Sequence, residues 1–257
     1  MEQGPQNLGL SIGSLFSGIG GMDLGLEAAG VGETIWQVEK DPYARRVLKK
    51  HWPDVARFDD VRSVGIANLE RVHIIQGGFP CTETSVSGQV VRNQAGLDGE
   101  HSSLWWEMLR VCGELLPEFI VVENPPGLIT NPAGIGQVLG GLSDLGYHAR
   151  YDMLSSSACG APHARFRVFI IAQRIVSNSD GERLPKREGL ETNWAYAATP
   201  GSAGWFSEPN VGRVASGIPN RVDRMRCLGN AITPAVAYQV GLALRKLIEN
   251  TAPLDTV

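Results

Sequence analysis

The sequence lacks any Cys-x-x-Cys pair: its four cysteines, among 257 residues, are far apart and have no histidine at metal-ligand spacing. This distribution argues against a zinc site and against a disulfide framework. We therefore expect no metal, and we expect free thiols, one of which could act as a nucleophile.

Long apolar runs are absent as well. No run approaches the ~18 residues that a membrane-spanning helix requires. The first residues, MEQGPQNLGLSIGSLF, do not have the basic and then apolar pattern of a secretory signal. We expect a cytoplasmic protein that contacts no membrane.

An excess of positive charge is also missing. The net charge is −4, whereas proteins that bind nucleic acid usually carry basic patches. The charge is uneven, however: residues 1–149 carry 10 Lys and Arg against 18 Asp and Glu, and residues 150–226 carry 11 against 7. Contacts to phosphates, if there are any, should concentrate in 150–226.

Up to residue 175 the chain alternates short apolar runs with amphipathic stretches. The runs predict strands around SIGSL, TIWQV, VHIIQ, FIVV and FRVFIIAQR, and the stretches predict helices at 22–30, 41–52 and 102–116. FIVV and FRVFIIAQR have the apolar character of central parallel strands. This order predicts an α/β fold with a doubly wound sheet.

Residues 176–226 differ from the rest of the chain. They are rich in Gly, Pro, Ser and Asn, show little periodicity, and predict a small loop-rich insert. Regular structure then returns, because Val236, Val240, Leu244 and Leu247 share one face of a predicted helix.

A glycine turn follows the first strand and opens the first helix. Gly18, Gly20 and Gly21 would let a ligand approach the backbone, and a helix N-terminus favours negative charge. Asp23 stands where a dinucleotide fingerprint has its last glycine, which disfavours a nicotinamide dehydrogenase. Such turns are also common as purely structural features, so the turn alone leaves both roles open.

Three carboxylates follow predicted strands. Glu39 could accept hydrogen bonds from a ribose, and Asp60 from an adenine amino group, although both could equally be surface carboxylates. Glu123 follows four apolar residues, and burial would raise its pKa, which suits a proton donor. A structural ion pair is the alternative for Glu123.

One cysteine stands out. Cys81 ends the turn GGFPC, directly after a predicted strand, and strand ends in open α/β sheets face the ligand crevice. Cys112 lies within an amphipathic helix and should belong to the core, which is also the favoured interpretation of Cys159 and Cys227.

Six motifs together resemble those of the DNA cytosine-5 methyltransferases, in the order of that family. They are FSGIGG at 16–21, EKD at 39–41, GGFPC at 77–81, ENPPG at 123–127, GAPHARFR at 160–167 and GNAITP at 229–234. They cover nearly the whole chain. The resemblance implies a class I S-adenosylmethionine-dependent methyltransferase with a Rossmann-like doubly wound sheet and a small loop-rich target-recognition element.

The resemblance also implies a mechanism. The Cys81 thiolate would add to carbon 6 of a flipped-out cytosine and make carbon 5 nucleophilic. Glu123 would protonate or hydrogen-bond ring nitrogen 3, Arg165 would hold the base near the cysteine, and Arg167 would support it and contribute to DNA binding. Residues 82–100 would form a closing loop over the DNA.

By the same resemblance, the chain binds S-adenosylmethionine and releases S-adenosylhomocysteine. Pro80 would lie beside the cofactor. The residues expected to contact the adenosine are Phe16, Glu39 and Asp60. Those expected at its methionine end are Gly18, Gly20, Gly21 and Asn230.

The chain departs from the family pattern at Thr82, Pro125 and His163, and most of all in its short recognition region. We expect a catalytic domain at 1–175 and 227–257 and a recognition element at 176–226, similar to compact phage and prophage members. A short element can make few base contacts, so a short target sequence or relaxed specificity is expected. Besides Arg167, the candidates for DNA contact are Arg213, Asn220, Arg221 and Arg224.

The expected partner is double-stranded DNA, and the expected state is a monomer in the cytoplasm of a bacterium or a phage-infected cell. Two alternatives stay open. One is an RNA cytosine-5 methyltransferase of the same fold that acts on transfer RNA. The other is a non-catalytic regulator that binds cofactor or DNA, which the presence of Cys81, Glu123 and Arg165 disfavours.

Overall fold

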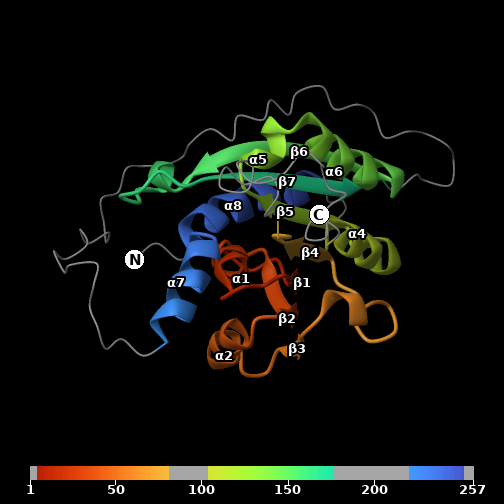
Figure 1. Ribbon diagram of the computed structural model, residues 1–257. Helices are drawn as coiled ribbons and strands as arrows, with labels where there is room; N and C mark the ends of the chain where they lie inside the picture. The colour runs from red at the N-terminus through yellow and green to blue at the C-terminus, as the bar shows by residue number, and fades with distance from the viewer. Residues whose placement is uncertain (1–4, 81–103, 176–219, 252–257) are drawn as a thin grey trace, which may run out of the picture.

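The computed structural model describes residues 5–80, 104–175 and 220–251. Its centre is a seven-stranded sheet in the order β3-β2-β1-β4-β5-β7-β6 (Figure 1). The strands are β1 (Leu10–Leu15), β2 (Gly32–Val38), β3 (Ala56–Phe58), β4 (Ile74–Gly77), β5 (Phe119–Asn124), β6 (Tyr147–Ser155) and β7 (Phe166–Arg174). The pairs among β1 to β5 are parallel, and β7 pairs antiparallel with both β5 and β6.

Helices cover both faces of the sheet. They are α1 (Gly21–Ala28), α2 (Pro42–His51), α4 (Leu104–Leu115), α5 (Gly127–Thr130), α6 (Pro132–Asp144), α7 (Arg221–Asn230) and α8 (Pro234–Thr251), with short 3-10 turns η1 (Val61–Ser63) and η2 (Ser156–Cys159). The arrangement confirms the predicted α/β fold with a Rossmann-like doubly wound sheet.

The prediction of a parallel strand at FRVFIIAQR was wrong. This segment is β7, which runs antiparallel to β5, and the preceding strand β6 was not predicted at all. Only residues 156–165 connect β6 to β7, and a parallel pair would need a crossover of a dozen or more residues. The edge strand β6 escaped detection because its residues are mostly half-buried or exposed.

Two apolar clusters fill the layers on either side of the sheet. On one side α4 and α6 pack on the strands, with Trp105 and Met108 fully buried. On the other side α1 and α8 pack together over β1. Burying each large apolar side chain contributes about 1.5–3 kcal/mol. These contacts stabilise the sheet whose strand ends carry the polar residues.

The sequence explains where α2 begins and ends. Asp41 is its N-cap and accepts hydrogen bonds from the backbone of Tyr43 (2.7 Å) and Ala44 (3.2 Å), while Pro42 occupies the first turn. The basic residues Lys49 and Lys50 lie in the last turn, where they complement the helix dipole.

The C-terminal helix α8 has the predicted apolar face. Val236, Val240 and Leu244 are buried against the sheet and α1, and Leu247 packs against the same cluster. The stretch 222–251, which joins α7 and α8, is the one part of the described chain long and apolar enough to span a membrane. The α8 half of this stretch places one face in the core.

Helix α7 begins at Arg221, inside the range 176–226 predicted to be loop-rich. The remaining part of that range, 176–219, lies outside the described residues, as does the loop predicted at 82–100.

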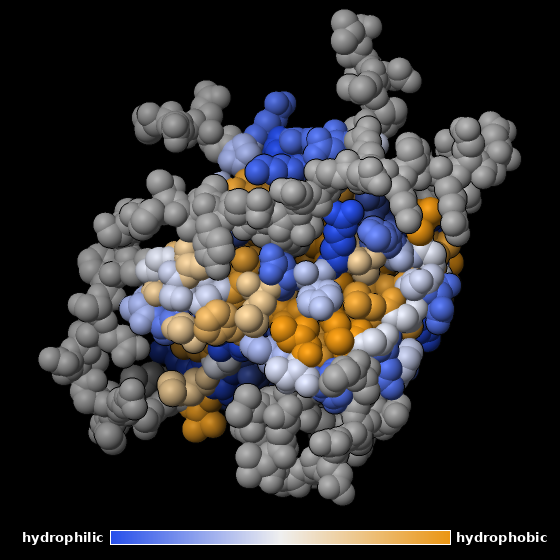
Figure 2. All heavy atoms as spheres, turned by 90° about the horizontal axis from the view of Figure 1, so that it is seen from above, coloured by the Kyte–Doolittle hydropathy of each residue, from blue (hydrophilic) through white to orange (hydrophobic). Residues whose placement is uncertain are grey.

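On the face seen in Figure 2, apolar side chains gather near the middle of the described surface, with polar side chains around them.

Candidate functional site

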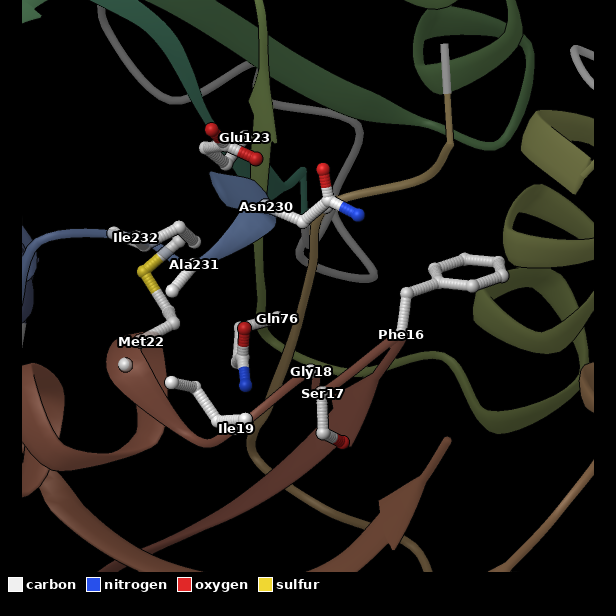
Figure 3. Close-up of a pocket in the computed structure, with 12 residues that line it drawn as sticks. Phe16, Ser17, Gly18, Ile19, Met22, Gln76, Glu123, Asn230, Ala231 and Ile232 are labelled. Atoms are coloured by element: carbon white, nitrogen blue, oxygen red, sulfur yellow. The ribbon is translucent and has the colours of Figure 1, made fainter. Parts of the chain in front are cut away.

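A pocket lies where the parallel strands β1, β4 and β5 end, at the edge of the sheet where open α/β folds bind ligands. In the view of Figure 3, Gln76 lies between Ile19 and Ser17 at one end and Glu123 and Asn230 at the other. The lining residues are Phe16, Ser17, Gly18, Ile19, Gly21, Met22, Gln76, Gly78, Glu123, Asn230, Ala231 and Ile232.

The glycine turn forms one wall of this pocket. Phe16 adopts a φ of 54°, a left-handed conformation that a non-glycine residue rarely takes, and Gly20 caps α1 with a φ of 85°. Gly21 must be glycine for a steric reason, since a Cβ there would lie 2.3 Å from the carbonyl oxygen of Ile232. The turn and the loop between α7 and α8 therefore meet at backbone contact distance.

Glu39 stabilises the glycine turn through hydrogen bonds. Its carboxylate accepts hydrogen bonds from the backbone N–H of Gly18 and of Asp41, both at 2.7 Å. Burial raises the pKa of Glu39. Asp60 caps η1 through the backbone N–H of Arg62 (3.0 Å). Neither carboxylate lines the pocket, so their contacts with an adenosine stay predictions.

A buried polar network that the sequence did not reveal lies behind the pocket. The Asp23 carboxylate, fully buried, accepts hydrogen bonds from Gln37 (3.1 Å), Gln76 (3.1 Å) and Ser14 (3.2 Å). Burial raises the pKa of Asp23 to about 6, although these hydrogen bonds oppose the rise. Gln76 belongs to both the network and the pocket wall. The sequence singled out Glu123 because it is a polar residue at the end of an apolar strand. Gln76 stands in the same kind of position, so the same signal could have identified it.

Glu123 is buried as predicted. Its side chain is 9% exposed, and Oε1 accepts an ion-paired hydrogen bond from Arg167 Nε at 2.8 Å. Burial raises the pKa of Glu123 to about 7, because desolvation outweighs the attraction of Arg167 and Arg165. The next residue, Asn124, donates to the carbonyl of Phe79 (3.1 Å) and so ties the end of β5 to the turn that follows β4.

The two predicted arginines make different contacts. Arg167, expected to support, is the arginine that contacts Glu123. Arg165, expected to hold the base, donates from Nη1 to the carbonyl of Gly229 (2.7 Å) and from Nη2 to the carbonyl of Ala231 (2.8 Å). The i and i+2 spacing would place both side chains on one face of an extended strand. Arg165 nevertheless bonds to the loop between α7 and α8, and only Arg167 contacts Glu123.

The structure brings together only part of the predicted site. Phe16, Gly18, Gly21, Glu123 and Asn230 line the pocket, whereas the catalytic candidate Arg165 and four cofactor candidates do not: Gly20, Glu39, Asp60 and Pro80. Residues that line the pocket without having been predicted are Ser17, Ile19, Met22, Gln76, Gly78, Ala231 and Ile232.

The cysteines divide as follows. Cys81 follows Pro80 in the sequence and lies outside the described residues. Cys112 is fully buried in α4, as predicted, and burial strongly raises its pKa. Cys227 is also buried and Cys159 is half-buried. Within the described ranges, no three His, Cys, Asp or Glu side chains group as they would around a metal ion.

Besides Arg167, which ion-pairs with Glu123, three of the DNA-contact candidates lie at the start of α7. Arg213 lies outside the described residues. Asn220 is the N-cap of α7 with a φ of 54°, Arg221 is its first residue, and the exposed Arg224 donates to the Tyr43 hydroxyl at 3.4 Å.

Comparison with known proteins identifies relatives. Residues 10–196 match the family model described as C-5 cytosine-specific DNA methylase. The Type II methyltransferase M.Bsp6I of Bacillus sp. (strain RFL6) is 31% identical over 185 residues, which cover 70% of this chain and 58% of that protein. The Type II methyltransferase M.NgoFVII of Neisseria gonorrhoeae is 32% identical over 171 residues, covering 65% and 44%. The chain thus spans about half the length of these relatives.

Solved structures share the fold. The Dnmt2 methyltransferase of S. pombe superposes with a TM-score of 0.63 at 18% identity, covering 93% of this chain and 99% of that one. A structure described as a candidate DNA modification methyltransferase encoded within an E. coli prophage has a TM-score of 0.53 at 25% identity, covering 64% and 47%.

Proposed function

The chain belongs to the C-5 cytosine-specific DNA methylase family, and on this premise we propose that it transfers the methyl group of S-adenosylmethionine to carbon 5 of cytosine in double-stranded DNA. The observation that carries the proposal is the buried Glu123–Arg167 pair at one end of a pocket built by the glycine turn and the loop around Asn230. A proton donor thus lies beside a place for a small ligand.

The pocket suits S-adenosylmethionine, which supplies an electrophilic methyl group when bound. The N-terminus of α1 opens onto it and has no side-chain cap, and the N-terminus of a helix favours a carboxylate. Apolar side chains (Phe16, Ile19 and Met22) and polar ones (Gln76 and Asn230) line it together, as a ligand with an aromatic ring and a charged end requires.

The chain's own residues would then carry the reaction. The Cys81 thiolate adds to carbon 6 of the cytosine, and a proton held by Glu123 is donated to ring nitrogen 3. A pKa of about 7 keeps that proton available at neutral pH. After carbon 5 has taken the methyl group, its proton is lost to solvent, the bond between Cys81 and carbon 6 breaks, and the proton on ring nitrogen 3 returns to Glu123, which restores the ring.

Arg167, rather than Arg165, is the arginine we assign to the base. Its Nε orients the Glu123 carboxyl, and its Nη1 donates to the carbonyl of Phe166 at 2.7 Å, so Nη2 is the nitrogen that we assign to an oxygen of the cytosine. The cytosine must leave the duplex stack to arrive there. The start of α7, with Asn220, Arg221 and Arg224, would contact the DNA together with Arg213 in the recognition element.

The family match and the Type II relatives favour DNA over transfer RNA. We further propose that the protein acts as a monomer in the cytoplasm, in restriction-modification or phage protection. The test is to supply S-adenosylmethionine with a labelled methyl group and either duplex DNA or transfer RNA, and to analyse the nucleosides. We expect 5-methyldeoxycytidine. Cys81→Ala should abolish it, and the matched control Cys159→Ala should not. Label in transfer RNA alone would support the RNA alternative.

A further inference from the structure

Arg165 hydrogen-bonds to the chain segment that forms one wall of the pocket, and not to Glu123. Its Nη1 and Nη2 donate to the carbonyls of Gly229 and Ala231, at 2.7 and 2.8 Å, which flank the pocket residue Asn230. The last carbonyls of a helix have no partner within the helix, and a cation at that end is favourable. Arg165 thus satisfies the C-terminus of α7 where the chain turns into the wall.

A second tie holds the same wall. The hydroxyls of Ser156 and Thr233 are 2.8 Å apart, and Thr233 immediately follows the wall residues. Ser156 also donates its backbone N–H to the carbonyl of Arg165 at 3.0 Å. The connection between β6 and β7 therefore contacts both ends of the segment 229–233, through Arg165 at one end and Ser156 at the other. Arg165 and Ser156 are also hydrogen-bonded to each other.

The wall has little freedom to adjust on its other side. The Ile232 carbonyl lies against Gly21, where even a Cβ would be 2.3 Å away. A shift of the loop would therefore either close the pocket on the glycine turn or withdraw Asn230 from it. The position of the loop sets the width of the pocket, and Arg165 sets the position of the loop.

We propose that Arg165, assisted by Ser156, is a positioning residue for the cofactor pocket and not a residue that binds the target base. The inference rests on the proposed function for the identity of the ligand. It gives the two arginines of the segment 165–167 separate tasks: Arg167 orients Glu123, and Arg165 holds the wall that faces the cofactor.

Calorimetric titration of the full chain with S-adenosylhomocysteine and S-adenosylmethionine, without DNA, tests the proposal. Arg165→Met should weaken binding by about 10-fold or more, equivalent to about 1.4 kcal/mol. Arg165→Lys should fall between it and the wild type, because an ammonium cannot bridge two carbonyls as a guanidinium does. The milder variant Ser156→Ala should weaken binding in the same direction and serves if Arg165→Met does not fold.

The matched control is Arg174→Lys, the same change at the far end of β7, which should bind as the wild type does. Under turnover, Arg165→Lys should raise the KM for the cofactor and leave the KM for DNA unchanged. Wild-type cofactor affinity in both Arg165→Lys and Ser156→Ala, or a raised KM for DNA alone, would overturn the proposal. Wild-type protein that binds cofactor but methylates no nucleic acid would instead contradict the proposed function.

Discussion

Replacing Glu123 with Gln should change how stability depends on pH. Burial raises the pKa of Glu123 from 4.5 to about 7 in the folded protein, so the folded state binds this proton more tightly than the unfolded state does. The stabilisation is complete below pH 4.5 and is lost as the pH rises to about 7. Two and a half pKa units correspond to about 3 kcal/mol.

Gln has nearly the same shape and cannot ionise. Replacing the protonated carboxyl with an amide changes its hydrogen bonding with Arg167, which gives Glu123→Gln an offset in the free energy of unfolding that does not depend on pH in this range. On top of that offset, the variant should gain about 3 kcal/mol relative to the wild type between pH 4.5 and pH 8. Asp23 titrates in the same window but is present in both proteins, so its contribution cancels.

Urea unfolding of both proteins, followed by far-ultraviolet circular dichroism at half-unit intervals from pH 4.5 to 8, measures the difference directly. The two curves of free energy against pH should diverge, with most of the change between pH 5 and 7. Parallel curves would refute the reasoning, since they would mean that Glu123 is ionised in the folded protein at all these pH values.

Three further predictions concern the same region. Asp23→Asn should gain about 3 kcal/mol in unfolding free energy relative to wild type as the pH rises from 4 to 6, by the same sign argument and a pKa of about 6; a pH-independent difference would contradict it. Gly21→Ala should abolish cofactor binding in a titration, because its Cβ would collide with the loop between α7 and α8, whereas Gly136→Ala, with open space around it, should bind normally and be up to about 1 kcal/mol more stable. Arg167→Met should raise the pKa of Glu123 further and leave a protonated carboxyl at neutral pH, so the pH profile of any remaining activity should move to higher pH; an unmoved profile would show that Arg167 does not act on Glu123.

Local chemistry made much of the fold readable from the sequence. The α2 boundaries follow from Asp41 and Pro42, and the buried face of α8 follows from the spacing of Val236, Val240 and Leu244. Strand direction was not readable in the same way, because β7 is as apolar as a parallel strand and its direction depends on β6. That edge strand has no strong pattern of its own.

The sequence predicted a site residue correctly where its residue type and its position after a strand were enough to imply its environment. Glu123 after an apolar strand was such a case, and burial by its neighbours followed. The division of work between Arg165 and Arg167 was not readable, since both have the same side chain. Only the fold shows that the loop between α7 and α8 occupies one of them. The sequence showed Asp23 only as a departure from the dinucleotide fingerprint, because its hydrogen-bond partners come from three different strands.

The central claim is that Cys81 attacks carbon 6 of cytosine in DNA. Duplex DNA that carries 5-fluorocytosine tests it most directly, because fluorine cannot leave as the proton does and the enzyme must remain bonded to the base. With S-adenosylmethionine present, the wild type should form a covalent adduct that survives a denaturing gel, and Cys81→Ala should form none. An adduct with Cys81→Ala, or none with a wild type that binds cofactor, would contradict the account.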